Sequence, residues 1–430
     1  MFKCNPKTIL QASHFCLVIF LIALSSTSIL AATGGNAIIY LNDRQQLITD
    51  WGYDIKWEGK GNHLTPSGAQ NYFVDQKFSK LRVPIWGNAS KPAHPSDGVV
   101  VTSIYDKTIT AMTNVINANP DTVLFASKKL EGQDSFPAWV KDSNGVIAAE
   151  YAKLLADFLE YMESEGFYID VLGVDNELEW NEGNITAEKY KDIVDELIAL
   201  SVTRGFNMPL LIAPETFNIN NANPWMDTLL TNGWGDAVDI AGAHYYPQHR
   251  NVSRLQTFVG HAGDRPKWHT EVHWDSDRTA EEALRIVFEC FDEGFSGMTW
   301  WGYPFSGLKG EIAQNLTTST AKTRPVDMDD IDGRKLTLGS LMTRAFYDRG
   351  RLKIWVINNS ATAYSSYGFD LDSGSLVNSI QYTQWTKTDS NTVTATIVDE
   401  NTFQLDIPEY TTTLIECVVS QHELIAYYPY

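Results

Sequence analysis

Long apolar runs are missing from this chain beyond its first thirty residues. Residues 15–24 form a short apolar run that follows a basic start and precedes small residues up to Ala32. This is the layout of a secretory signal peptide, and the run is shorter than the ~20 residues that a membrane span needs. We therefore expect residues 1–31 to be removed on export and the mature protein to be secreted, either extracellular or periplasmic, without membrane association.

Cysteine is also scarce, which excludes a small fold held together by disulfides. The 430 residues include four cysteines, and Cys4 and Cys16 leave with the expected signal peptide. Cys290 and Cys417 remain, and their spacing suits no metal site. We therefore expect two buried thiols.

Basic residues are outnumbered by acidic ones. The chain has 33 Lys and Arg against 53 Asp and Glu, a net charge of −20. Because binding to phosphate depends on Lys and Arg, this balance argues against nucleic acid as a partner. The sequence also lacks a glycine-rich nucleotide fingerprint after its first strand, a His-Glu-x-x-His motif and a Gly-x-Ser-x-Gly motif. We expect no cofactor and no metal.

Strand and helix patterns alternate along most of the chain, which is typical of a parallel sheet with crossover helices. The expected strands cover residues 49–56, 80–85, 122–127, 170–176, 209–214, 237–244, 267–271 and 296–303. The expected helices cover residues 67–78, 104–118, 148–165, 187–204, 225–230, 253–260, 280–293 and 335–347, with a long polar loop over 306–334. Eight such units predict an α/β fold of the (β/α)8 TIM barrel type and not an open doubly wound sheet.

Short alternating strands separated by Asn, Asp, Ser and Gly follow Gly350. This pattern predicts a C-terminal antiparallel β-sandwich, which two short N-terminal strands within 36–48 are expected to join. The expected organisation is a signal peptide, N-terminal strands, a catalytic barrel and a sandwich, at residues 1–31, 32–48, 49–348 and 349–430. Because no low-complexity linker separates the last two, we expect them to pack rigidly. We also expect a monomer.

Two glutamates at the ends of predicted strands are the main candidates for chemistry. Glu177 follows the strand over 170–176, and Glu271 ends the strand over 267–271. Barrel enzymes carry their sites at the C-terminal ends of the strands, so these two carboxylates are expected to face each other across the mouth. Glycoside hydrolysis needs such a pair, one to protonate the leaving oxygen and one to attack the sugar or activate water. Taken alone, each glutamate is better explained as a solvated loop acid, and the catalytic interpretation rests on the two occurring at matching strand ends.

Residues at neighbouring strand ends are candidates to support this pair. Arg82 lies inside a predicted strand, where a charge needs a carboxylate partner, and Glu271 is the candidate. Such pairing would keep Glu271 ionised. Asn176 can orient a sugar hydroxyl. Further candidates from the ends of the sixth and eighth strands, for which ordinary packing is the alternative, are His244, Tyr246, Trp300 and Trp301.

These residues resemble a clan A glycoside hydrolase and, within that clan, family 30. The segments that carry the resemblance are Gln45–Gly52, Leu81–Pro84, Phe125–Ser127, Pro137–Lys141 with Trp139, Val174–Glu177 and the Trp-x-Thr-Glu of Trp268–Glu271. The resemblance implies retaining hydrolysis by double displacement, with Glu177 as acid/base and Glu271 as nucleophile. It also implies that Arg82 and Tyr246 support Glu271, and that N-terminal strands join the sandwich.

Two departures from the family pattern concern the substrate. Leu178 stands where the family has proline, and Lys128 and Lys129 stand where it has Pro-Trp. Lys128 or Lys129, together with Arg250, can pair with a uronate or a sulfate, surface lysines being the alternative. The long polar loop and the aromatic mouth favour an endo-acting enzyme on a polysaccharide.

Two other functions stay open. Three histidines and a glutamate at two neighbouring strand ends, His244, His269, Glu271 and His273, are compatible with a metal-dependent barrel hydrolase, although no metal motif is present. The other is a non-catalytic secreted protein whose sandwich binds carbohydrate. Such a protein would need neither two converging glutamates nor Arg82.

Overall fold

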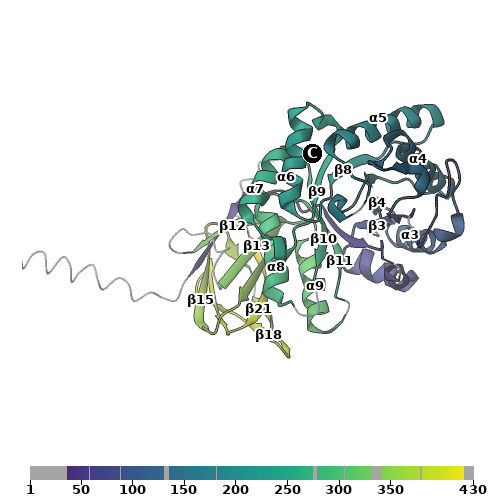
Figure 1. Ribbon diagram of the computed structural model, residues 1–430. Helices are drawn as coiled ribbons and strands as arrows, with labels where there is room; N and C mark the ends of the chain where they lie inside the picture. The colour runs from purple at the N-terminus through teal and green to yellow at the C-terminus, as the bar shows by residue number, and fades with distance from the viewer. Residues whose placement is uncertain are drawn as a thin grey trace, which may run out of the picture.

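The structure is a computed structural model, and it describes residues 36–57, 59–87, 89–129, 135–180, 182–274, 278–304, 306–330, 341–377 and 380–420. The expected signal peptide lies outside these residues. Figure 1 shows a barrel wrapped in helices with a smaller, mostly β body beside it.

Eight parallel strands close into a barrel, as the alternation of patterns predicts. In order around the barrel they are β2 (Asp50–Asp54), β3 (Lys80–Ile85), β4 (Val123–Lys128), β7 (Val171–Gly173), β8 (Leu210–Pro214), β9 (Ile240–Ala243), β10 (Lys267–His273) and β11 (Gly297–Gly302), which pairs with β2. Each overlaps an expected strand. All of β3 is buried, because helices cover the outside and side chains fill the inside.

Helices follow the strands and cover the barrel (Figure 1). They are α2 (Pro66–Gln70) with a π-helical turn (Asn71–Asp75), α3 (Asp106–Ala118), α4 (Ala148–Ser164), α5 (Ala187–Arg204), α6 (Ile219–Thr231), α7 (Val252–Ala262), α8 (Ala280–Asp292) and α9 (Gly307–Thr320). The start of α8 is set by a capping box, in which Thr279 and Glu282 satisfy each other's backbone N–H. The first seven expected helices are confirmed.

The segment after β11 differs from the prediction. We expected a loop over 306–334 and a helix over 335–347, but α9 is followed by β12 (Arg324–Asp330) and β13 (Leu341–Asp348). The parts of both predictions that fall on residues 331–340 lie outside the described residues. The polar composition of α9 is misleading because its hydroxyls bond to the preceding turn, as Thr320 Oγ1 does to the Leu316 carbonyl at 2.8 Å. Seven of the eight residues of β13 are buried, so the strand shows no alternation from which to recognise it.

The second body is an eleven-stranded, mostly antiparallel sheet. Its order is β18-β17-β21-β14-β13-β12-β1-β15-β20-β19, with β16 paired to β21. The bounds not yet given are β1 (Ala37–Arg44), β14 (Arg351–Asn358), β15 (Tyr364–Leu371), β16 (Ser375–Leu376), β17 (Gln381–Trp385), β18 (Ser390–Thr394), β19 (Thr396–Ile397), β20 (Thr402–Ile407) and β21 (Thr411–Ser420). The sheet surrounds its own apolar core, which includes Ile39, Phe369 and Phe403.

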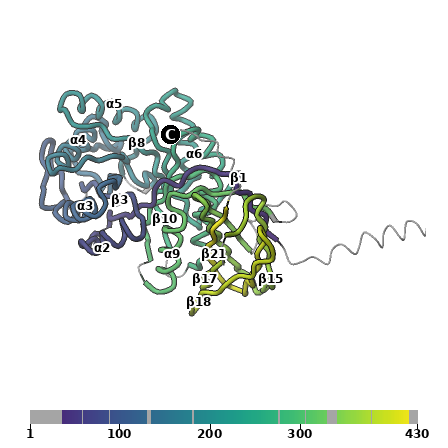
Figure 2. Tube along the Cα trace, turned by 180° about the vertical axis from the view of Figure 1, so that it is seen from behind, coloured from purple at the N-terminus to yellow at the C-terminus, as the bar shows by residue number. Residues whose placement is uncertain are grey.

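The N-terminal segment joins this second sheet, as predicted. It contributes one strand and not the two that we expected: β1 pairs antiparallel with β12 and parallel with β15, beside the C-terminal strands in Figure 2. The domain boundary at residues 348 and 349 stays a prediction, although β12 and β13 already belong to this sheet.

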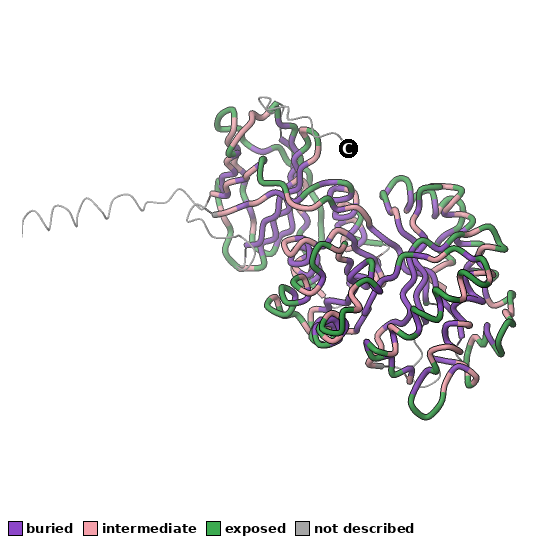
Figure 3. Tube along the Cα trace, turned by 90° about the horizontal axis from the view of Figure 1, so that it is seen from above, coloured by how far each residue is buried: buried purple, intermediate pink, exposed green. Residues whose placement is uncertain are grey.

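The two bodies pack against each other through α8 and α9. Arg344 of β13 pairs with Asp292 at the end of α8, with Nε–Oδ1 at 2.7 Å. Trp355 of β14 donates from Nε1 to Ser319 Oγ of α9 at 3.0 Å. Phe346 and Trp355 of the sheet belong to the same apolar core as the barrel and its helices, and Figure 3 shows buried residues in the interior of both bodies.

Cys290 and Cys417 are both free and buried, as predicted. Among the residues that the structure describes, no helix combines the length and the apolar character needed to span a membrane.

Candidate active site

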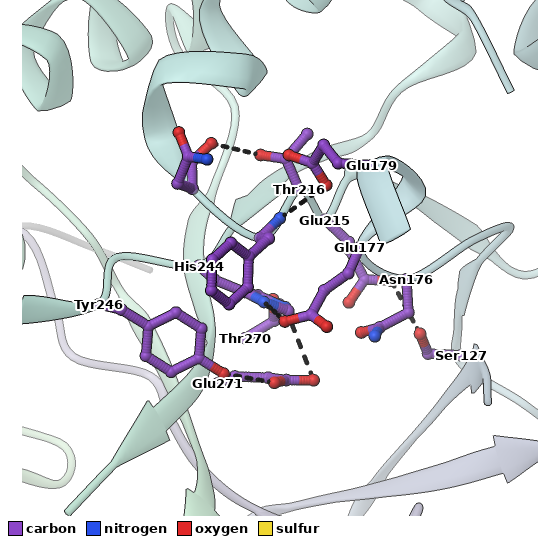
Figure 4. Close-up of polar contacts among 12 residues, drawn as sticks. Ser127, Asn176, Glu177, Glu179, Glu215, Thr216, His244, Tyr246, Thr270 and Glu271 are labelled. Carbon is purple, nitrogen blue, oxygen red and sulfur yellow. Dashed lines mark hydrogen bonds and ion pairs between the residues drawn. The ribbon is translucent and has the colours of Figure 1, made fainter. Parts of the chain in front are cut away.

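Seven barrel strands bring polar side chains to one end of the barrel (Figure 4 shows part of the group). The group comprises Asp54 and Lys56 at the end of β2, Arg82 in β3, Ser127 in β4, Asn176 and Glu177 after β7, Glu215 after β8, His244 and Tyr246 after β9, and Glu271 in β10. This is the C-terminal end of the strands, where parallel barrels carry their sites.

Glu271 is a buried carboxylate with donors on both oxygens. Oε1 accepts hydrogen bonds from Arg82 NH1 at 2.7 Å and Lys56 Nζ at 3.0 Å, and Oε2 accepts one from the Tyr246 hydroxyl at 2.6 Å. Burial raises the pKa of Glu271, yet neighbouring positive charges and the tyrosine hydroxyl together hold that pKa well below its ordinary value. Glu271 is therefore ionised at neutral pH.

Glu177 lies in a different environment. Its side chain is 13% exposed, and Oε1 lies 3.1 Å from His244 Nδ1. Its backbone has a φ of +51°, a conformation that side-chain-bearing residues rarely adopt. The Glu177 N–H donates to the Glu215 carbonyl at 2.9 Å, which holds this strained turn in place. Strain of this kind concentrates at functional sites, where the surrounding structure supports it.

The two glutamates converge. One oxygen of Glu177, one of Glu271 and a ring nitrogen of His244 all lie within 4.8 Å of one another. His244 stands between the carboxylates, with Nε2 3.7 Å from Glu271 Oε1. Figure 4 shows both carboxyl groups turned toward the imidazole.

Three buried charges around Arg82 were missed by the sequence analysis. Arg82 NH1 donates to Asp54 Oδ2 at 3.1 Å, and NH2 pairs with Glu215. Lys56 Nζ donates to Asn176 Oδ1 at 2.6 Å. Glu215 carried a usable signal, because it directly follows an expected strand, as Glu177 does. Asp54 and Lys56 carried the same signal, because both lie at the end of the first expected strand, which covers residues 49–56.

Glu215 fits only because residue 173 has no side chain. A Cβ on Gly173 would overlap Glu215 Oε2 and lie 3.2 Å from Ser127 Oγ. Ser127 Oγ itself donates to Glu215 Oε2 at 3.0 Å. Gly173 therefore makes room for the carboxylate that balances Arg82.

A cavity of about 320 Å³ opens over the two glutamates. Its rim includes Trp57, which is 49% exposed and meets Trp301 edge-on at a ring distance of 6.0 Å. Lys129 Nζ lies 4.1 Å from the centre of the Trp57 ring. The remaining lining residues are Lys56, Asn176, Glu177, Phe217, Tyr246, Gln248, Glu271, His273 and Arg278.

The structure brings four of the eight predicted binding or supporting residues to this cavity. Asn176, Tyr246, Lys129 and Trp301 line it. His244 lies behind the glutamates, in contact with both.

Four residues that we expected at the site lie elsewhere. Trp300 is buried and stacks on Trp51 at 5.6 Å, because neighbouring residues of β11 point to opposite sides of the strand. Trp139 donates from Nε1 to the His94 carbonyl at 2.8 Å and packs against the barrel core. Arg250 is paired with Glu289, at 2.7 Å from Nε to Oε1, and Lys128 is buried with Nζ donating to the Lys129 carbonyl at 2.9 Å.

The four metal ligands of the alternative interpretation, His244, His269, Glu271 and His273, do not come together among the residues that the structure describes. Within the described ranges, the residues whose ligand atoms cluster are Glu177, His244 and Glu271. The pKa of His269 is lowered to about 3 by burial, with a contribution from His244, and His273 packs edge-on against Trp301 at 4.4 Å. Both Glu271 oxygens already accept hydrogen bonds. Two of the three donors, Arg82 and Lys56, are cations that would repel a metal ion.

Comparison with known proteins gives a likeness in fold. No protein-family model matches this chain, and no curated protein sequence matches it. A family 30 endoxylanase from Clostridium papyrosolvens aligns with a TM-score of 0.67 and 17% identity, over 89% of this chain and 100% of that one. An endo-β-1,6-glucanase aligns at 0.62 and 13%, over 90% and 94%. A conserved exported protein from Bacteroides fragilis aligns at 0.62 and 12%, over 89% and 100%. The chain thus has the fold of glycoside hydrolase family 30 structures over nearly nine-tenths of its length.

Proposed function

We propose that this protein is a secreted, retaining glycoside hydrolase that cleaves a polysaccharide, with Glu271 as nucleophile and Glu177 as acid/base. The observation that carries the proposal is the pair of carboxylate oxygens within 4.8 Å of each other at the barrel mouth. Retaining enzymes hold their two carboxyl groups ~5–5.5 Å apart, whereas inverting enzymes need ~6.5–9.5 Å to admit a water.

In the first chemical step the two glutamates have different roles: Glu271 attacks and Glu177 donates a proton. A Glu271 oxygen attacks the anomeric carbon while the bond from that carbon to the glycosidic oxygen breaks. The leaving oxygen takes its proton from Glu177, and a covalent glycosyl-enzyme forms. Arg82, Lys56 and Tyr246 hold Glu271 in its charged, attacking form.

The second step returns the enzyme to its starting state. Glu177, now ionised, takes a proton from a water whose oxygen attacks the same anomeric carbon, and the bond from that carbon to Glu271 breaks. His244 contacts Glu177 through Nδ1 and faces Glu271 through Nε2, so it orients one carboxylate relative to the other.

The cavity supports a polysaccharide as substrate, and internal cleavage is part of the same proposal. Trp57 and Trp301 offer aromatic surface at the rim, and such rings pack on the apolar faces of sugars. The side chains of Lys129 and Arg278 also line the cavity, which supports a substrate with uronate or sulfate groups. The expected long loop, which we had linked to an extended cleft, is not part of this support because α9 and β12 take its place.

The test combines two substitutions with product analysis. We expect Glu271→Gln to reduce hydrolysis to background, and Glu177→Gln to lower kcat/KM about 10²–10⁴-fold on a substrate with a poor leaving group. Wild-type protein is screened against neutral, uronate-bearing and sulfated polysaccharides, with products sized and their anomeric configuration followed by proton NMR. Full activity in both variants, or an inverted first product, would sink the assignment.

A metal-dependent hydrolase is the second candidate, because Glu177, His244 and Glu271 bring three ligand atoms together. Dialysis against a chelator separates the two mechanisms. Unchanged hydrolysis after chelation is expected from the two-carboxylate mechanism, whereas a loss that zinc or manganese restores would support the metal. If the wild type binds glycans and cleaves none, the protein is a carbohydrate-binding protein instead.

A further inference from the structure

A second hollow lies where the barrel meets the sheet domain. It has a volume of about 230 Å³ and is lined by the starts of α8 and α9 on one side and by the ends of β14 and β17 and the start of β21 on the other. Its lining includes Trp274, Arg278, Asn359, Trp385, Lys387 and Tyr410. We call it the junction groove.

The junction groove continues from the catalytic cavity. Arg278 lines both hollows, so they share a wall. Its NH2 donates to Gln248 Oε1 at 3.0 Å on the side of the catalytic cavity. Trp274 of the groove directly follows His273 of the catalytic cavity in the chain. A linear ligand that leaves the catalytic cavity past Arg278 therefore arrives in the groove.

The groove has aromatic residues that are suited to binding a sugar chain. Tyr410 is 45% exposed at the turn before β21, where its ring can pack on a sugar face. Trp385 is 2% exposed, and its Nε1 has no hydrogen-bond partner among the described residues. The indole is stacked on Trp355 at 5.8 Å, which limits its rotation toward a partner elsewhere. An unpaired buried N–H is unfavourable, and a sugar oxygen that reached it from the groove, which Trp385 lines, would satisfy it.

Polar groups of the groove complete the match. Lys387 Nζ lies 5.0 Å from the centre of the Tyr410 ring, beside the aromatic surface. The Asn359 amide donates to Glu281 Oε2 at 3.3 Å, at the point where the sheet domain meets α8. A ring surface flanked by an ammonium and an amide is the combination that binds hydroxyl-rich ligands.

We propose that the junction groove binds a distal segment of the same polysaccharide chain that is cleaved at Glu177 and Glu271. The identity of the bound polysaccharide rests on the proposed function, but the existence of a binding site in the junction groove does not. Only substrates that are long enough to reach the groove bind there in addition to the catalytic cavity. The enzyme therefore distinguishes its substrates by chain length.

The kinetic test compares a polymer with its own tetrasaccharide. The polymer is the one from the screened panel that the wild type cleaves. We expect Tyr410→Ala to lower the ratio of kcat/KM on the polymer to kcat/KM on the tetrasaccharide about fivefold. Trp385→Phe, which keeps a ring but removes the N–H, is expected to lower the same ratio. Tyr168→Ala is the matched control, because Tyr168 is 62% exposed and lies beside the opposite ends of the barrel strands. An unchanged ratio in both groove variants would overturn the proposal.

A binding test separates this proposal from the proposed function. The Glu271→Gln protein, with and without Tyr410→Ala, is run through native gels that contain each polysaccharide of the panel. Retardation that Tyr410→Ala weakens supports the groove, even if the wild type cleaves nothing and the proposed hydrolysis fails. Equal retardation of both proteins, or no retardation by any polysaccharide, contradicts the groove while leaving the hydrolysis test untouched.

Discussion

Tyr246 is the neutral residue among those that hold Glu271 in place. Its hydroxyl donates to Glu271 Oε2 at 2.6 Å, and burial together with the nearby charge of Glu271 raises the pKa of Tyr246 well above its ordinary value, so it stays a donor. At the scale of single residues, each such contact influences the protonation state of one side chain, and single substitutions test that influence.

We expect Tyr246→Phe to shift the acid limb of the pH–activity profile to higher pH. The lost hydrogen bond stabilises the charged form of Glu271, so its removal raises the pKa of Glu271 and reduces the ionised fraction in acid. A net hydrogen-bond contribution of about 1 kcal/mol corresponds to a several-fold loss in kcat/KM. The measurement is kcat/KM against pH for both proteins. An acid limb that stays in place would show that Tyr246 does not tune Glu271.

Lys129→Ala tests whether the cationic rim selects charged substrates. Lys129 lines the cavity with its ammonium over the Trp57 ring. A hydrogen bond to a charged group contributes about 1.5–3 kcal/mol, so we expect KM for a uronate-bearing or sulfated polymer to rise at least tenfold relative to a neutral polymer. If the variant treats every acidic glycan as the wild type does, this role of Lys129 is refuted.

At the scale of elements, the barrel was predictable and its connection to the second sheet was not. The strands are apolar runs that end in polar residues, and this local pattern located all eight. By contrast, β13 was expected within a helix and α9 within a loop, because local pattern and composition misrepresent buried strands and hydroxyl-rich helices.

A glycine in β7 provides the test at this scale. We expect Gly173→Ala to displace the Glu215 carboxylate, unbalance Arg82 and lower kcat/KM at least tenfold. Gly260→Ala is the matched control, since Gly260 lies in α7 with open space around the added Cβ, and helix propensity predicts a gain in stability of up to about 1 kcal/mol. Equal activity and thermal stability of both variants would show that Glu215 needs no space at residue 173.

At the scale of the whole molecule, buried neutral histidines make stability depend on pH. Burial, with a contribution from Lys128, lowers the pKa of His94 from 6.5 to about 3, and burial, with a contribution from His244, lowers that of His269 to about 3. Between pH 6.5 and about 3 the unfolded chain binds protons at these sites and the folded chain does not. The free energy of unfolding therefore falls as the pH falls below 6.5.

We expect each histidine to remove about 2 kcal/mol of stability between pH 7 and pH 5. Urea unfolding at the two pH values measures the loss. His94→Gln, which can keep a hydrogen bond to the Tyr105 hydroxyl, 3.0 Å from Nε2 in the wild type, should reduce the dependence on pH. A variant with the full wild-type dependence would show that His94 titrates normally in the folded protein.

The sequence by itself determined the barrel, the N-terminal strand of the second sheet and the residues Arg82, Glu177 and Glu271 as candidates. It did so because apolar strands, an isolated buried charge and acids at strand ends are local patterns. Only the tertiary structure decided that Trp301 lines the cavity and Trp300 does not, since closure of the barrel sets which face of β11 points outward. It also decided the contacts of Lys56 and Glu215, because the charges that they balance come from strands far apart in the chain and meet only when the barrel closes.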